Sequence, residues 1–115
     1  MHNFKELNIW KKSKDLSKDI FQLTSNFPSE HKFGLSSQLN RCSVSVPSNI
    51  AEGSSRDSQK DFARFLQISL GSAFELETQL IIAGEIELIS SEELEKLLER
   101  TTEVQRMIHG FKSKL

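Results

Sequence analysis

The sequence predicts an all-α protein whose helices form an antiparallel up-down four-helix bundle. Apolar residues recur at steps of three and four along four segments, the pattern of helices that bury one face. No segment shows strand-like alternation of apolar and polar residues between turn dipeptides. Short connections make neighbouring helices antiparallel. A chain of 115 residues can bury a core without disulfides or metal, so residues 1–115 are predicted to be a single four-helix-bundle domain.

The first helix is predicted over Asn8–Ser25. It ends ahead of Pro28, because the residue before a proline is steered away from helical backbone angles. Its inner stripe consists of Ile9, Leu16, Ile20, Leu23 and Phe27. The second helix is predicted from about Lys32 to Glu52, with an inner stripe of Leu35, Leu39, Cys42, Val46 and Ile50.

Pro47 lies inside this second helix, where a proline costs about 3 kcal/mol. A fresh helix starting at Pro47 would leave Val46 as its N-cap, and valine is a poor capping residue. We therefore expect one bent helix over residues 34–52, whose freed backbone groups are covered by polar side chains. The candidates for this role are the hydroxyls of Ser43, Ser45 and Ser48 and the amide of Asn49. Gly53 is expected to end the helix in a left-handed conformation.

Capping boxes mark where the third and fourth helices begin. Ser58 is followed three residues later by Asp61, and Ser90 is followed at the same spacing by Glu93. Ile89 and Leu94 flank the second box where a hydrophobic staple belongs. The fourth helix then continues an apolar heptad through Leu94, Leu97, Thr101, Val104, Ile108, Phe111 and Leu115.

The third helix carries two apolar stripes, more than a surface helix in a bundle needs. The first stripe consists of Phe62, Leu66, Ala73, Leu76, Leu80 and Ala83, and is expected to fill the core. The second consists of Leu70, Phe74, Ile81 and Leu88, and is the candidate oligomer interface. Gly71 weakens the helix interior by about 1 kcal/mol, which close approach of another backbone would explain. The sequence therefore predicts a homo-oligomer.

Composition excludes several classes of protein. The net charge of −1 rules out a uniformly basic nucleic-acid binder, but residues 1–65 carry ten Lys/Arg against seven Asp/Glu and residues 66–115 carry five against nine. A basic end or rim therefore stays open, beside the alternative that these charges lie on the solvated faces of ordinary helices. No Glu-x-x-His pair or Cys/His spacing indicates a metal, and no glycine-rich loop indicates a phosphate cradle. We expect no cofactor, no small-molecule substrate, no membrane span and a cytoplasmic location, with Cys42 as a buried apolar residue.

The polar residues that stand out admit two interpretations. In the structural one, Glu52 pairs with Lys60 or Arg64, and Arg41 projects toward the middle of the bundle to meet Glu75 or Glu77. In the functional one, basic side chains contact phosphates without discriminating between bases. The candidates for that role are Lys11, Lys12, Arg41, Arg56, Lys60 and Arg64.

Several separated motifs resemble one protein family. They are Leu7–Lys12, the run from Gln38 to Gly53 that contains Pro47, Asn49 and Glu52, the segment Phe62–Leu66, and the segment Gly71–Leu80. Together they cover the chain from about Phe4 to the last helix. The sequence is similar to the small bacterial proteins associated with 23S rRNA intervening sequences, whose relatives include accessory variability proteins of diversity-generating retroelements.

The resemblance implies a four-helix bundle that assembles as a homopentamer and has no established enzymatic activity. It also implies association with RNA or with a nucleic-acid-handling protein. The chain departs from the family in having Asn40-Arg41-Cys42 where two arginines are usual, which weakens the case for nucleic acid. An oligomeric protein-interaction scaffold that binds no nucleic acid stays open as the alternative.

Overall fold

A computed structural model describes residues 2–115; Met1 lies outside the described residues. The prediction of an all-α chain with four long helices is confirmed, and no β-strand occurs in the described range. Two short 3-10 helices accompany the α-helices. The elements are η1 (Phe4–Glu6), α1 (Asn8–Thr24), η2 (Ser29–His31), α2 (Leu35–Ser54), α3 (Gln59–Glu85) and α4 (Ser91–Ser113). The second helix begins three residues later than predicted, because η2 and a turn precede it.

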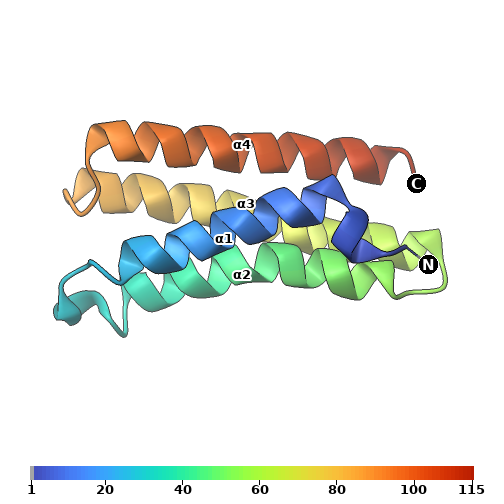
Figure 1. Cartoon of the computed structure of the whole chain (residues 1–115), viewed down its shortest axis with the longest axis horizontal. Coiled ribbons are helices and arrows are strands. Elements are labelled where there is room, and N and C mark those ends of the chain that lie inside the picture. The colour runs from blue at the N-terminus through green and yellow to red at the C-terminus, as the bar shows by residue number, and fades with distance from the viewer. Residues whose placement is uncertain (1) are drawn as a thin grey trace.

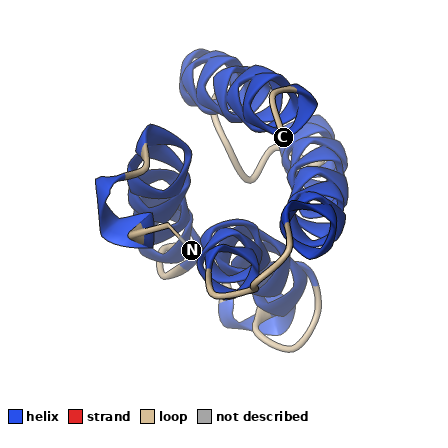
Figure 2. Ribbon diagram, turned by 90° about the vertical axis from the view of Figure 1, so that its right-hand side faces the viewer, coloured by secondary structure: helices blue, strands red, loops and turns tan. Residues whose placement is uncertain are grey.

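The four helices lie lengthwise beside one another in a body of 43 × 24 × 20 Å (Figure 1). Both termini and the α2–α3 loop lie at one end, which Figure 2 views along the bundle. Contacts tie this end together: the His2 amide donates to the Ser54 carbonyl at 3.2 Å, and the His2 ring lies against Phe62 and Phe111. The α1–α2 and α3–α4 connections lie at the opposite end.

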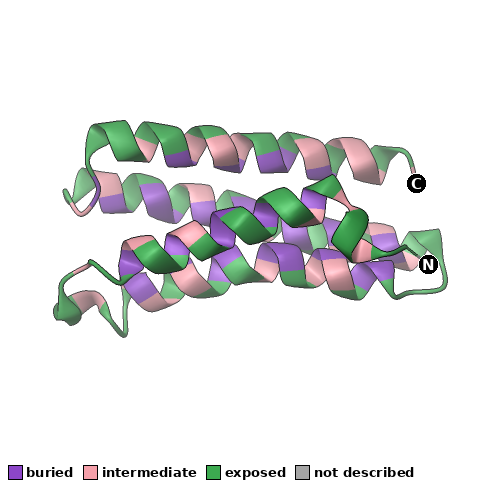
Figure 3. Cartoon of the chain, in the orientation of Figure 1, coloured by how far each residue is buried: buried purple, intermediate pink, exposed green. Residues whose placement is uncertain are grey.

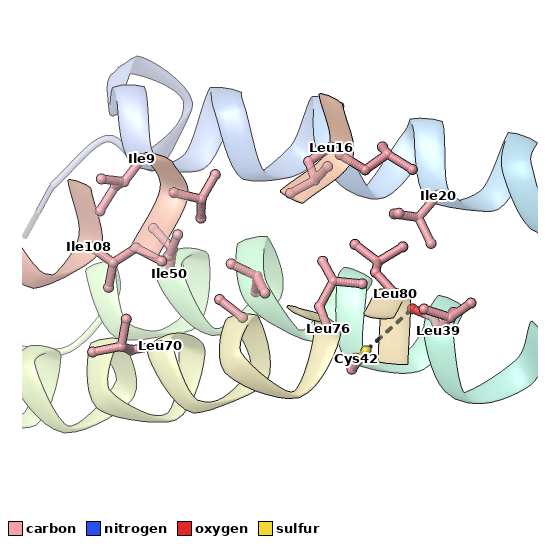
Figure 4. Close-up of a cluster of buried hydrophobic side chains, with 14 of the residues drawn as sticks. Ile9, Leu16, Ile20, Leu39, Cys42, Ile50, Leu70, Leu76, Leu80 and Ile108 are labelled. Atoms are coloured by element: carbon pink, nitrogen blue, oxygen red, sulfur yellow. Dashed lines mark hydrogen bonds between the residues drawn. The ribbon is translucent and has the colours of Figure 1, made fainter. Parts of the chain in front are cut away.

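The predicted core stripes are buried between the helices (Figures 3 and 4). All six residues of the first stripe on α3 belong to the core, and so do the central positions of the stripes on the other three helices. The residues at the ends of those stripes are partly buried against it; these are Leu23, Phe27, Leu35, Leu94, Phe111 and Leu115. The helical period therefore identified most of the core, to which Leu70 and Ile89 also belong.

Pro47 lies within a continuous α2, so the predicted helix through this position is confirmed. Asn49 covers the backbone as expected, because its Nδ2 donates to the Ser45 carbonyl at 2.8 Å. The expectation for the serines of α2 holds only in part: Ser43 Oγ donates to the Asn40 carbonyl at 3.0 Å, but the Ser45 hydroxyl bonds to Ser72 on α3 at 2.9 Å. A hydroxyl from α3 bonds to the residue before the proline, because Ser69 Oγ donates to the Val46 carbonyl at 2.8 Å. Packing against α3 thus supports the proline-containing turn.

Gly53 does not end α2, which corrects the expected left-handed cap. The helix continues to Ser54, and no glycine in the described residues has a positive φ. Gly53 is needed instead for close packing, because an added Cβ would lie 2.7 Å from Phe65 Cβ and 2.9 Å from Phe62 Cδ1. The left-handed residue is Glu87, with φ 65° after α3. There the Leu88 amide donates to the Ala83 carbonyl at 2.9 Å, as in a Schellman motif.

Both predicted capping boxes supply the expected N-cap. Ser58 Oγ accepts from the Asp61 amide at 3.0 Å, and Ser90 Oγ accepts from the Glu93 amide at 3.1 Å. Each bond satisfies one of the amide groups that the first helical turn leaves without an intrahelical acceptor. The Ser58 cap also fixes the start of α3 directly after the loop that carries Arg56, so it sets where that arginine lies relative to the first turns of α3.

Candidate nucleic-acid interface

Three of the predicted basic residues lie together where α2 passes into α3. We call the group Arg56, Lys60, Arg64 and Phe65 the basic corner. The guanidinium carbon of Arg56 lies 4.7 Å from the centroid of the Phe65 ring, and that of Arg64 lies 5.7 Å from it. Both distances are within the range of a cation–π contact. One aromatic ring therefore positions two guanidinium groups at the same end of the bundle.

The charges of the basic corner are available to an anion. The only ion pair that the described structure shows there joins Arg64 Nη2 to Asp61 Oδ1 at 3.7 Å, with both side chains more than half exposed. Such exposed pairs contribute little and are readily exchanged. Guanidinium groups present planar arrays of donors that match phosphate oxygens. The arrangement suits contact with phosphates along a nucleic-acid strand.

Lys11 and Lys12 lie on the first turns of α1, at the same end of the bundle. Lys12 Nζ pairs with Glu103 Oε1 at 3.1 Å, and both side chains are half exposed. Lys11 is exposed. Because Glu103 already neutralises part of the charge of Lys12, this pair of lysines offers less positive charge to an anion than the basic corner does.

Arg41 lies apart from the other candidates, and its expected course toward the middle of the bundle was wrong. The side chain is exposed and pairs with neither proposed acid within 4 Å; Glu77 Oε1 instead accepts from Gln105 Nε2 at 2.7 Å. Arg41 and Glu75 line opposite sides of one hollow between α2 and α3. The expected partners of Glu52 are also absent, since no ion pair in residues 2–115 includes it.

Charge separates along the bundle more strongly than along the chain. When each helix is divided at its midpoint, the end that holds the termini (residues 2–16, 45–72 and 102–115) carries ten Lys/Arg against six Asp/Glu, a balance of +4. The opposite end (residues 17–44 and 73–101) carries five against ten, a balance of −5. The basic end includes Arg106, Lys112 and Lys114 of α4, which a division of the chain into halves counts with the acidic part. The ends lie several Debye lengths apart in a body 43 Å long, so they act separately on a charged partner.

Cys42 is buried, as predicted. Burial, with a smaller contribution from the negative charge of Glu75, raises the pKa of its thiol to about 12. Cys42 Sγ donates to Gln79 Oε1 at 3.4 Å, while His109 is exposed on α4. The thiol is therefore protonated at neutral pH and unsuited to nucleophilic attack. Within residues 2–115 no group of three or more His, Cys, Asp or Glu side chains is arranged to hold a metal ion.

The raised pKa of Cys42 predicts a loss of stability in alkali. The unfolded thiol ionises near its ordinary pKa of 9.0, whereas the folded one holds its proton to about 12. The stabilisation is therefore complete below pH 9 and declines as pH rises toward 12, by about 2 kcal/mol at pH 10.5. Urea unfolding at pH 8 and pH 10.5 measures this loss. Cys42→Ala should remove the part due to the thiol, and an equal loss in both proteins would contradict the assignment.

The outer surface of α3 is unusually apolar. Among the candidate interface residues, Phe74 and Ile81 are 53% and 39% exposed, but Leu70 lies in the core and Leu88 is partly buried against it. Sequence reasoning missed three further isoleucines that are 43–50% exposed: Ile68 and Ile82 on α3, and Ile86 directly after it. Their positions fall outside the two stripes that helical periodicity selected. The position of Gly71 also lies open, with nothing within 4 Å of an added Cβ.

No helix among the described residues is long and apolar enough to span a membrane.

Fold and site together define a small helical-bundle protein with a basic end and an apolar outer helix face. Over residues 5–110 the chain matches the family of 23S rRNA-intervening sequence proteins, and it belongs to that family. It is also similar to a crystal structure from Bacteroides thetaiotaomicron, described as a protein of unknown function from the S23 ribosomal protein family. The two are 28% identical with a TM-score of 0.85, over 91% of this chain and 95% of that one. No curated protein matches the chain.

Proposed function

We propose that this chain is a cytoplasmic, non-catalytic, antiparallel four-helix-bundle protein that forms a homo-oligomer and binds RNA through its basic end. The observation that carries the proposal is the pair of guanidinium groups, from Arg56 and Arg64, held against the one ring of Phe65. The ring limits where these long side chains can go, so less conformational entropy is lost when they bind phosphate. No base edge needs to be recognised for such contacts.

Assembly would strengthen a site that is weak in one copy. The exposed apolar side chains of α3 favour self-association, because Phe74 and Ile81 lie seven residues apart on one face and apolar surface gathered on a small domain commonly marks an interface. Gly71 favours it too, since no packing within the chain requires a glycine there. Repeating the basic corner around a ring, of five subunits by the resemblance, would raise the overall affinity through multivalency. We also propose, from the resemblance to accessory variability proteins that the sequence motifs imply, that the chain acts with a partner that handles nucleic acid.

The experiment is retention of a labelled single-stranded RNA by the wild type and by two charge-matched triple variants. Arg56→Ala with Lys60→Ala and Arg64→Ala removes the basic corner. Lys18→Ala with Lys32→Ala and Lys96→Ala removes the same charge from the acidic end. We expect the first variant to weaken binding at least tenfold and to lower the slope of log affinity against log salt by about 2, and the second to have little effect.

Lys11→Ala with Lys12→Ala should weaken RNA binding less than the basic-corner variant, because Glu103 already pairs with Lys12. Circular dichroism and light scattering check that every variant keeps its helices and its assembly. Equal losses in the two triple variants would mean that the basic corner is not the site.

The exposed apolar face of α3 also supports the second candidate, an oligomeric protein-interaction scaffold that binds no nucleic acid. The two functions differ at low ionic strength, where phosphate contacts are strongest. Absence of RNA retention by the wild type at about 50 mM salt would reject the RNA proposal and favour the scaffold.

A further inference from the structure

A polar hollow lies between α2 and α3, apart from the basic corner. Its volume is about 390 Å³, and it is lined by Gln38, Arg41, Cys42, Ser45, Ser72 and Glu75. The proposed phosphate contacts of the basic corner use none of these residues. Their side chains offer hydrogen-bond donors and acceptors rather than apolar surface, which is unusual between two closely packed helices. The hollow is therefore a candidate site for a small polar group.

Opposite charges stand on the two sides of the hollow. Arg41 comes from α2 and Glu75 from α3, and the described structure shows no ion pair for either side chain. They do not approach each other within 4 Å, so a molecule between them can meet both. One side of the hollow therefore supplies a donor fork and the other supplies a carboxylate acceptor.

The buried side-chain amide of Gln79 holds the carboxylate of Glu75 in place. Gln79 is only 7% exposed, and its Nε2 donates to Glu75 Oε2 at 3.4 Å and to Gln38 Oε1 at 3.3 Å. Its Oε1 accepts from the Cys42 thiol at 3.4 Å, which fixes which end of the amide faces Glu75. Ser45 and Ser72, joined at 2.9 Å, also line the hollow. The carboxylate is thus oriented before any ligand arrives.

The hollow and the basic corner lie along the same side of the bundle. The alignment is set by α3, where Arg64 of the basic corner and Glu75 of the hollow are both helical. Eleven residues at the helical rise separate these two positions by about 16 Å. Arg64, Ile68 and Glu75 are spaced by four and seven residues, so they fall on one face of α3. A strand whose phosphates contact the basic corner can therefore run along this face to the hollow.

We propose that the hollow between Arg41 and Glu75 binds an unstacked guanine base. Guanine presents O6 and N7 as neighbouring acceptors, which match an arginine fork. Its N1–H and N2–H donors, on the Watson–Crick edge, match a carboxylate. Adenine keeps N7 but would place its N6 amino donor toward Arg41 and its N1 acceptor toward Glu75, so the contact with Arg41 would be weakened and that with Glu75 would be unfavourable. For a base within RNA the inference rests on the proposed function; a free guanine nucleotide offers the same base.

The test compares a labelled oligouridine with the same strand carrying one central guanosine. Fluorescence anisotropy should show about tenfold tighter binding of the guanosine strand to the wild-type protein. Arg41→Lys keeps the charge but loses the planar fork, and Glu75→Gln replaces the carboxylate. Each should abolish the preference for guanosine while oligouridine still binds. Glu85→Gln, which removes an acid outside the hollow, is the control and should keep the preference.

A second experiment adds free guanosine monophosphate or adenosine monophosphate to the protein. Binding is followed by the NMR chemical shifts of the Arg41 and Gln79 side chains. Binding of the guanine nucleotide alone, without retention of either strand, would support the hollow and reject the RNA function. Equal affinity for the two strands, with no nucleotide selectivity, would overturn the guanine site and leave phosphate binding intact. Absence of both strand and nucleotide binding would overturn both proposals.

Discussion

Replacing Gly53 by alanine is expected to destabilise the bundle by about 1–3 kcal/mol, although alanine is the better helix former. The added Cβ would lie 2.7 Å from Phe65 Cβ, an atom fixed to the backbone that no rotamer change can move away. It would also lie 2.9 Å from Phe62 Cδ1, in a side chain only 3% exposed. The start of α3 must therefore shift relative to α2, and that shift breaks core contacts.

Gly110→Ala is the matched control. Gly110 lies inside α4 with nothing within 4 Å of an added Cβ, so the substitution should stabilise the protein by about 1 kcal/mol through helix propensity alone. Urea unfolding of the three proteins measures the difference, at a salt and protein concentration held constant. A Gly53→Ala variant as stable as Gly110→Ala would refute the close contact between α2 and α3.

The same substitution connects the fold to the proposed site. Phe65 packs closely against Gly53, and the guanidinium groups of Arg56 and Arg64 lie against its ring. A displacement of Phe65 therefore displaces the basic corner. Gly53→Ala should weaken RNA binding even though it removes no charge, whereas Gly110→Ala should not.

The fold could be predicted from the sequence because the apolar residues that form the core recur at a helical period. A buried helical face repeats every three or four residues, and this repeat located the core on all four helices, including the stretch through Pro47. The role of Gly53 was not predictable in the same way. A glycine near a helix end suits a left-handed cap and suits close packing of a second helix, and only the position of Phe65 across the contact distinguishes the two.

The candidate site was predictable in composition but not in arrangement. The spacing of Arg56, Lys60 and Arg64 predicted that they lie together. Arg56 is in the loop before the Ser58 cap, and the two others are on the first turns of α3. The contact of both arginines with Phe65 depends on side-chain direction, which periodicity does not give. Arg41 was expected to meet Glu75 or Glu77, but Gln105 engages Glu77 and a hollow separates Arg41 from Glu75. Long side chains on neighbouring helices have too many rotamers for spacing alone to choose their partners.

Phe74→Asp combined with Ile81→Asp is expected to convert the proposed homo-oligomer into smaller, still helical particles. Both side chains are exposed on α3 in the single chain, so the substitutions remove no core contact and should leave the fold intact. In an assembled state they would place two carboxylates in an apolar interface, where an unpaired charge costs several kcal/mol. Sedimentation velocity gives the particle size, and circular dichroism gives the helix content.

Phe33→Asp is the control for this double variant, because Phe33 is 90% exposed in the α1–α2 connection rather than on α3. It should leave the assembly unchanged, which separates loss of a specific interface from a general effect of removing exposed aromatic surface. A monomer mass for the wild type at micromolar concentration would reject self-association altogether. If Phe33→Asp dissociated the assembly and the α3 variant did not, the interface would lie at the α1–α2 connection, at the opposite end of the bundle from the basic corner. RNA binding would then still depend on multivalency, but Gly71 and the isoleucines of α3 would need another explanation.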